Sequence, residues 1–204
     1  MLTELSRRAF GLSALAPLLR GASPRPLFNG KDFSGWRKAG NGIWSIEDSL
    51  VAGRFDQAKP GPGYLMTEEE FTDFDLKVEY WISKEGNSGV YVREPKRAWG
   101  PKGDDRPGFG AAGGYEVQID YNDQKNYTGA LYNFSPATKH TGGEEQWIAM
   151  RVLCEGPRIR VWSAGELVND FSPSRCLKGV IGLQIHGGKP HDHIVKFRSI
   201  EVTV

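Results

Sequence analysis

The sequence is poor in several features that would assign it to common classes of protein. It has no run of 18 apolar residues, so we expect no membrane-spanning helix. Its 204 residues carry a formal net charge of only +1 and show no basic stripe, which argues against nucleic acid as a partner. No window shows a long helical period, and there are only two cysteines, Cys154 and Cys176.

The chain is instead rich in glycine, proline and aromatic residues, with 26 glycines, 12 prolines and 11% aromatics. Short runs rich in Val, Ile, Tyr, Phe and Trp lie between clusters of Gly, Pro, Asn and Asp. This pattern predicts an all-β fold, a two-sheet antiparallel β-sandwich or jelly roll. One helical turn is expected, at Thr67–Phe71, and a single domain over residues 26–204.

The first 22 residues have the layout of an export signal. The pair Arg7-Arg8 precedes a short apolar stretch with small residues, which resembles a twin-arginine signal. We therefore expect an exported protein, periplasmic or extracellular, with no membrane partner once the signal is removed. Because such substrates usually fold in the reducing cytosol, buried free thiols at Cys154 and Cys176 are favoured over a disulfide.

Polar side chains recur at alternate positions of three expected strands. In the strand 115–120, Glu116, Gln118 and Asp120 alternate with apolar residues. Tyr91 and Arg93 do the same in an earlier strand, and Gln184 and His186 in a late one. Such rows must lie on the outer side of a sheet, since burying them in the core would be costly.

Two interpretations of these rows remain open. If the sheet is concave, amides, carboxylates and a guanidinium line a groove that suits sugar hydroxyls. Aromatic residues at its rim could then stack on a sugar ring, the candidates being Trp99, Tyr121, Tyr127 and Tyr132. The other interpretation is a solvated outer face with ordinary cross-strand ion pairs such as Arg93–Glu116.

The sequence requires no cofactor, although a divalent cation is compatible with it. Asp120, Asn122 and Asp123 offer oxygen ligands, and His191 and His193 form an H-x-H pair in a loop. A segment of roughly 20 residues rich in Gly and Pro, 94–114, is expected to project from one end and fold over a face.

Five stretches in a fixed order resemble the 3-keto-disaccharide hydrolase domain, a bacterial family of concanavalin A-like jelly rolls. They are "LFNGKDFSGW", "GNSGVYVRE", "GGYEVQID", "TGALYNFSP" and "GVIGLQIHGG" with the following "VKFRSIEV". The chain departs from the family at Gln146-Trp147, where a Trp-Asn pair is usual, and at Ala164-Gly165, where Asn-Gly is usual. The resemblance implies a β-sandwich that cleaves sugars oxidised at C3, with a carbohydrate as its partner.

The resemblance also implies roles for particular residues. The groove-lining stretches of the family fall on Arg93, Glu116, Gln118 and His186. A ketone at C3 acidifies the C2 proton, so cleavage needs a base, donors for an enolate oxygen and an acid for the leaving oxygen. We expect His186 or Glu116 as base and Arg93 as enolate stabiliser. The expected sugar contacts are Tyr91, Trp99, Gln118, Asp120, Tyr132 and Gln184.

Two other functions remain open from the sequence. One is a conventional retaining glycosidase that uses Glu116 and Asp120, although residues four apart on a strand lie about 13 Å apart. Retaining chemistry needs carboxyl groups about 5–5.5 Å apart, so the side chains would have to converge. The other is a non-catalytic carbohydrate-binding module that uses the same groove.

Overall fold

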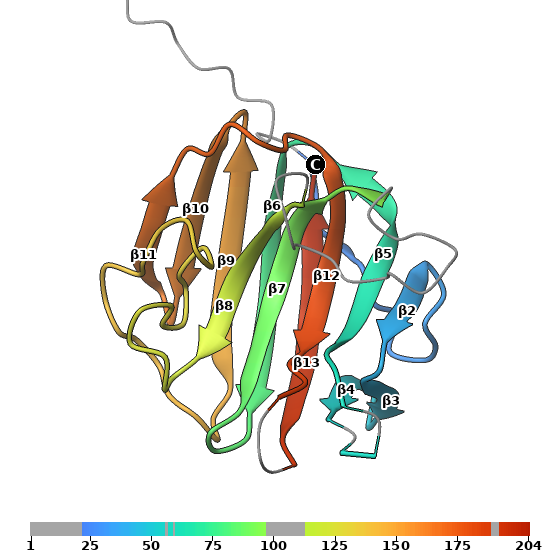
Figure 1. The fold of residues 1–204 in the computed structure, drawn as a ribbon. Coiled ribbons are helices and arrows are strands. Elements are labelled where there is room, and N and C mark those ends of the chain that lie inside the picture. The colour runs from blue at the N-terminus through green and yellow to red at the C-terminus, as the bar shows by residue number, and fades with distance from the viewer. Residues whose placement is uncertain (1–21, 56, 59, 97–112, 189–191) are drawn as a thin grey trace, which may run out of the picture.

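Alternating apolar and polar residues build two antiparallel sheets that pack face to face (Figure 1). The computed structural model describes residues 22–55, 57–58, 60–96, 113–188 and 192–204. The expected export signal, Trp99, His191 and most of the expected long loop lie outside these residues. The described residues contain no helix of the length and apolarity that a membrane span needs.

The larger sheet lies behind the smaller one in Figure 1. It has eight strands in the described part of the chain, with short β1 (Arg25–Pro26) paired to β13 off the main path. The order along the main path is β11 (Glu166–Phe171), β10 (Arg158–Ser163), β9 (Ile148–Glu155), β6 (Phe74–Ile82), β13 (Ile194–Thr203), β4 (Leu50–Arg54) and β3 (Ile43–Glu47).

The smaller sheet has five strands among the described residues and carries the polar rows. Its order is β2 (Trp36–Gly40), β5 (Gly63–Phe71), β12 (Gly179–Ile185), β7 (Asn87–Glu94) and β8 (Tyr115–Asp120). The three strands with polar rows are therefore direct neighbours, β12–β7–β8, although they come from distant parts of the sequence. This arrangement confirms the predicted all-β sandwich.

The helical turn expected at Thr67–Phe71 is wrong, because these residues form the second half of strand β5. Their backbone pairs with β2 on one side and β12 on the other. Thr67 and Phe71 are buried, while the three glutamates between them are exposed. Pairing on both edges outweighs the helix preference of a short glutamate run.

The main core lies between the sheets, where alternate residues of each strand meet. The smaller sheet contributes Val90, Val92, Tyr115, Val117 and Ile119, and the larger sheet contributes residues such as Leu76, Val152 and Phe197. A second buried apolar cluster consists of Ala39, Tyr64, Met66, Tyr91 and Val180. Its members alternate with core residues, so it covers the opposite, outer face of the smaller sheet.

Arg93 does not lie on that outer face, which corrects the placement predicted for it. Its backbone adopts a positive φ of 54°, and the register of β7 with β12 shifts there, as in a β-bulge. The side chain is fully buried and reaches the larger sheet. Its guanidinium donates hydrogen bonds to the carbonyl oxygens of Thr72 and Gly156 and pairs with Asp73 at 3.1 Å.

No disulfide joins Cys154 and Cys176. Cys154 is buried in the main core, and this burial raises the pKa of its thiol to about 12. Its thiol is therefore a packing group rather than a nucleophile.

We predict that Arg93→Ala destabilises the fold by on the order of 3 kcal/mol, because two carbonyl oxygens lose their donor in a buried setting. Urea unfolding followed by tryptophan fluorescence measures the loss. Arg25→Ala is the control, since Arg25 pairs with Glu69 at an exposed site and should cost far less. Equal losses for the two variants would contradict a clamping role for Arg93.

Candidate functional site

A small cavity of about 100 Å³ opens on the outer face of the smaller sheet. It brings together five of the residues that the sequence singled out, Glu116, Gln118, Tyr132, Gln184 and His186. They come from β8, from the segment that follows it, and from the end of β12. Residues far apart in the sequence thus share one hollow, as the alternation of the strands predicted.

Strand register explains how two amides come to flank one glycine. Gln118 of β8 lies opposite Gly89 of β7, and Gly89 lies opposite Gln184 of β12. Neighbouring strands are about 4.8 Å apart, so the two glutamines stand on either side of Gly89. Both glutamines are buried. The missing side chain at Gly89 leaves a notch between them.

Glu116 places its carboxyl group at this notch. Tyr91, its cross-strand partner, donates a hydrogen bond of 2.8 Å from Oη to Glu116 Oε2. Burial raises the pKa of Glu116 from its ordinary value of 4.5 to about 7, against hydrogen bonds from Tyr91 and Gln184 that lower it. A carboxyl group with this pKa can accept and release a proton at neutral pH.

The two glutamines present oxygen atoms that accept no hydrogen bond from the described residues. Gln184 Nε2 donates to Tyr91 Oη at 3.2 Å, and Gln118 Nε2 makes a long bond of 3.5 Å to Asn87 Oδ1. Within the part of the chain that the structure describes, neither Oε1 has a hydrogen-bond partner, although both are buried. Buried acceptors of this kind suit a ligand that brings hydroxyl groups.

Asp120 takes part in the fold rather than in the cavity. Its Oδ2 accepts a hydrogen bond of 2.7 Å from Asn87, and its Oδ1 accepts the backbone N–H groups of Asn122 and Asp123. Asp120 is buried and is not among the residues that line the hollow. The sugar contact predicted for it is therefore replaced by a structural one, which orients Asn87 and closes the turn after β8.

Other predicted residues also lie outside the group. Arg93 is held between the sheets, so the structure does not bring it to Glu116 and His186. Tyr91 touches Glu116 but packs edge-on against Tyr64 at 5.7 Å and is almost fully buried, so it faces the carboxyl rather than the open cavity. The proposed rim aromatic Tyr121 bonds to Tyr80 at 2.7 Å, and Tyr127 stacks on His140 at 3.7 Å.

Sequence reasoning missed three residues of the cavity as parts of a site, Pro62, Tyr64 and Asn87, and offered Asp123 only as a cation ligand. A signal for Asn87 was present, because it precedes Gly89 and Tyr91 at alternate positions of the same strand. Asp123 has a lowered pKa, chiefly because Asn126 donates to its side chain, so it stays charged at neutral pH. Pro62 and Tyr64 lie at the start of β5, where no polar row marked them.

The described residues contain no group of three or more His, Cys, Asp or Glu side chains that could hold a metal ion. His193 of the expected H-x-H pair is buried and stacks on Phe55 at 5.6 Å. Asp120 Oδ1 already accepts two backbone N–H groups.

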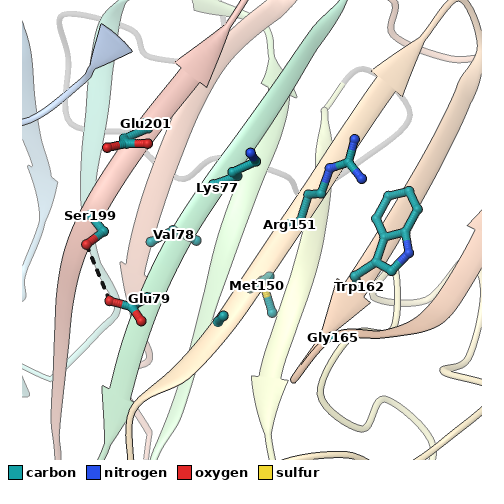
Figure 2. A pocket seen from close by; sticks show the side chains of 10 residues that line it. Lys77, Val78, Glu79, Met150, Arg151, Trp162, Gly165, Ser199 and Glu201 are labelled. Atoms are coloured by element: carbon teal, nitrogen blue, oxygen red, sulfur yellow. Dashed lines mark hydrogen bonds between the residues drawn. The ribbon is translucent and has the colours of Figure 1, made fainter. Parts of the chain in front are cut away.

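A larger hollow of about 670 Å³ lies on the outer face of the other sheet and is shown in Figure 2. Two of its ionic groups are paired with neighbouring residues: Glu79 accepts from Arg198 at 2.7 Å, and Arg151 donates to Asp75 at 2.8 Å. The guanidinium of Arg151 also lies 4.5 Å from the centre of the Trp162 ring. In this hollow Glu79 and Arg151 are held in ion pairs, whereas the small cavity holds a half-buried carboxyl with a raised pKa. We therefore take the small cavity as the candidate site.

The fold assigns the chain to a structural class, and the match to a family model then assigns it to a family. Two packed antiparallel sheets place the chain among jelly-roll β-sandwiches of galectin-like form. The chain belongs to the 3-keto-alpha-glucoside-1,2-lyase-like domain family, whose model matches residues 23–203. The family resemblance inferred from the sequence is thereby confirmed.

Individual relatives agree with this assignment at lower similarity. A 3-keto-disaccharide hydrolase of Bacteroides thetaiotaomicron is 29% identical over 130 residues, 54% of this chain and 45% of that protein. The chain thus matches less than half the length of this relative. A presumed glycosyl hydrolase of Parabacteroides distasonis has a similar structure, with a TM-score of 0.68 and 22% identity over 88% of this chain and 93% of that one.

The same fold occurs in a carbohydrate-binding module of Bacillus subtilis. Its TM-score is 0.61, at 18% identity over 83% of this chain and 96% of the module. At this level of identity the likeness concerns the fold alone.

We predict that Glu116→Gln removes a pH dependence of stability. Because the pKa of Glu116 is raised in the folded state, the folded protein keeps its proton longer than the unfolded chain, so stability falls as pH rises from about 4.5 to about 7. The size is on the order of 3 kcal/mol. Unfolding free energies of wild type and variant at pH 5 and pH 8 measure it.

Glu201→Gln, on the outer face of the larger sheet, is the matched control and should keep the wild-type pH dependence. If Glu116→Gln keeps that dependence as well, the carboxyl of Glu116 does not titrate near neutrality.

Proposed function

We propose that this protein cleaves 3-keto-glycosides by elimination and hydration, with Glu116 as the base that removes the C2 proton. The observation that carries the proposal is the placement of Glu116: its half-buried carboxyl lines the cavity beside two buried amide oxygens, and its pKa of about 7 suits a general base at neutral pH. The family match supports the substrate class, since a 3-keto-disaccharide hydrolase is among the relatives.

The reaction begins when Glu116 takes the proton from C2 of the keto sugar. The electron pair of that C–H bond forms the C2–C3 double bond of an enolate, with the charge on the C3 oxygen. When the enolate collapses, the C3 carbonyl re-forms, a C1–C2 double bond forms and the bond between C1 and the glycosidic oxygen breaks; that oxygen leaves with a proton. Water then adds across the C1–C2 double bond, its oxygen to C1 and a proton to C2, so the net result is hydrolysis.

Neutral donors take the place that we had expected for Arg93. Within the described lining of the cavity no lysine or arginine occurs. The enolate oxygen would therefore be stabilised by side-chain N–H or O–H groups, and the candidates among the lining residues are Asn87, Gln118 and Tyr132. His186, at the end of β12, would donate the proton that the leaving oxygen needs.

The buried amide oxygens of Gln118 and Gln184 support a ligand rich in hydroxyl groups. Each would accept a hydroxyl of the sugar, while the notch between them is filled by the carboxyl of Glu116, which would face the ring edge that carries C2. This assigns the binding of the sugar to Gln118 and Gln184, and the proton transfers to Glu116 and His186.

A conventional retaining glycosidase is less well supported. It needs a second carboxyl about 5–5.5 Å from the first. The candidate from the sequence was Asp120, whose carboxylate oxygens accept three hydrogen bonds from Asn87, Asn122 and Asp123.

We predict that the protein releases nitrophenol from 4-nitrophenyl 3-keto-glucoside and not from the plain glucoside. Glu116→Gln should lower kcat by about 10²–10⁴-fold, because it removes the base. The wild-type kcat/KM should fall below a pH near 7, where Glu116 becomes protonated. Release of nitrophenol, followed by absorbance across pH 5–9, tests both expectations.

Glu201→Gln serves again as the control and should leave turnover unchanged. Release from the plain glucoside would point to a conventional glycosidase. Binding of the keto sugar without release would point to a carbohydrate-binding module, and either result would overturn the proposal.

A further inference from the structure

The two carboxylate oxygens of Glu116 lie in different surroundings, and strand β7 supplies a close neighbour to each; Gln184 of β12 also donates a hydrogen bond to this carboxyl. Oε2 accepts the hydrogen bond of 2.8 Å from Tyr91 Oη. Oε1 lies above Gly89, so close that a Cβ atom at this position would stand 2.4 Å from it and 2.8 Å from Cγ. Tyr91 and Gly89 are alternate residues of β7 and so face the same side of the sheet.

Glycine at position 89 matters because it leaves space for the side chain of Glu116, and not because of its backbone conformation. Its φ is not in the left-handed region that favours glycine, so alanine could adopt the same backbone. An alanine at position 89 would, however, displace the carboxyl of Glu116, because its Cβ atom would stand only 2.4 Å from Oε1, a distance that real Cβ atoms essentially never show. The carboxyl would have to rotate away from the notch between Gln118 and Gln184.

Tyr91 fixes the other oxygen and its direction. Gln184 Nε2 donates to Tyr91 Oη at 3.2 Å, which leaves the single hydroxyl proton of Tyr91 for Glu116. Burial and the neighbouring carboxyl of Glu116 raise the pKa of Tyr91, so it remains a donor at neutral pH. The hydroxyl therefore stabilises the ionised form of Glu116.

We propose that Gly89 and Tyr91 are positioning residues for Glu116: Tyr91 holds Oε2, and the bare backbone of Gly89 admits Oε1, which is the oxygen that receives the proton of the substrate. This inference rests on the proposed function. It goes further by naming the reacting oxygen and the two residues that place it. Neither residue is among those that line the cavity, so each acts through Glu116.

Other titratable and charged groups surround Glu116 and are common to all variants. Those that line the cavity are Tyr64 from β5, Asp123 and Tyr132 from the segment after β8, and His186 at the end of β12; Glu94 of β7 acts on Tyr91. Asp123 has a lowered pKa and keeps its charge through the neutral range. Histidine is the side chain whose reference pKa lies nearest to neutrality, so the titration is repeated in a His186→Gln background, which lacks the imidazole.

Tyr91→Phe and a carbon-13 titration of the glutamate side chains test the hydroxyl. The signal of Glu116 is assigned by its loss in Glu116→Gln. Because Tyr91 stabilises the charged form, its removal should move the titration midpoint upward by about one to two pH units. Tyr80→Phe, which removes the hydroxyl pair with Tyr121 away from the cavity, is the matched control and should leave the midpoint unchanged.

Gly89→Ala tests the notch through kinetics on the 3-keto-glucoside. Displacing the base should lower kcat by about 10²-fold, with KM changed far less, because misplacement by about 1 Å is enough for such a loss. Gly53→Ala is its control: a Cβ there would meet the Trp44 ring at 2.8 Å, so it crowds the fold away from the cavity. Gly53→Ala should lower the melting temperature without lowering kcat.

A midpoint that stays in place in Tyr91→Phe, or a Gly89→Ala enzyme with the kcat of wild type, would overturn the inference. If Gly89→Ala does not fold, the titration of Tyr91→Phe decides alone. The titration needs no substrate, so an upward shift in a protein that does not cleave keto sugars would refute the proposed function and leave the placement of Glu116 standing.

Discussion

The site depends on a carboxyl group kept away from water on the outside of a sheet. An ionised carboxylate in such a place is costly, and only hydrogen bonds to it make the cost tolerable. The protonation state of Glu116 is therefore set by opposing effects: burial favours the neutral form, while the hydroxyl of Tyr91 and the amide of Gln184 favour the charged form. A group in that balance changes its charge easily, which is what proton abstraction demands.

The smaller sheet makes this balance possible because its outer face is divided in two. One part is the apolar cluster around Tyr64, Met66 and Val180, which excludes water beside the carboxyl. The other part is the row of amides and the glycine notch. Polar and apolar side chains are thus adjacent on one surface, and Tyr91 belongs to both parts, since it packs in the apolar cluster and donates to Glu116.

Much of this arrangement follows from strict alternation, and this is where sequence reasoning succeeded. The run from Tyr115 to Asp120 has a regular period of two, so the faces of Glu116 and Gln118 could be predicted, as could those of Gln184 and Tyr91. It failed at Arg93, where a positive φ and a shift of register turn the side chain to the opposite side. A regular alternation of apolar and polar residues in the sequence does not reveal a β-bulge.

Contacts that depend on turns were also beyond prediction. Asp120 belongs to the polar row of β8, but its carboxylate accepts hydrogen bonds from Asn87 and from the backbone N–H groups of Asn122 and Asp123. The role of Gly89 could not be seen either, since a glycine in a strand has no pattern of its own. Its role depends on which side chain of the neighbouring strand lies over it, here that of Glu116.

The buried guanidinium of Arg93 has a consequence for how this family member can change in evolution. Arg93 fastens one end of β7 to the turns of the larger sheet, and four residues earlier the same strand carries Gly89. A single-residue insertion or deletion between Tyr91 and Arg93 that no further bulge absorbed would turn Tyr91 toward the main core and a valine toward the cavity. The spacing along the chain between tether and notch therefore decides which side chains face the cavity.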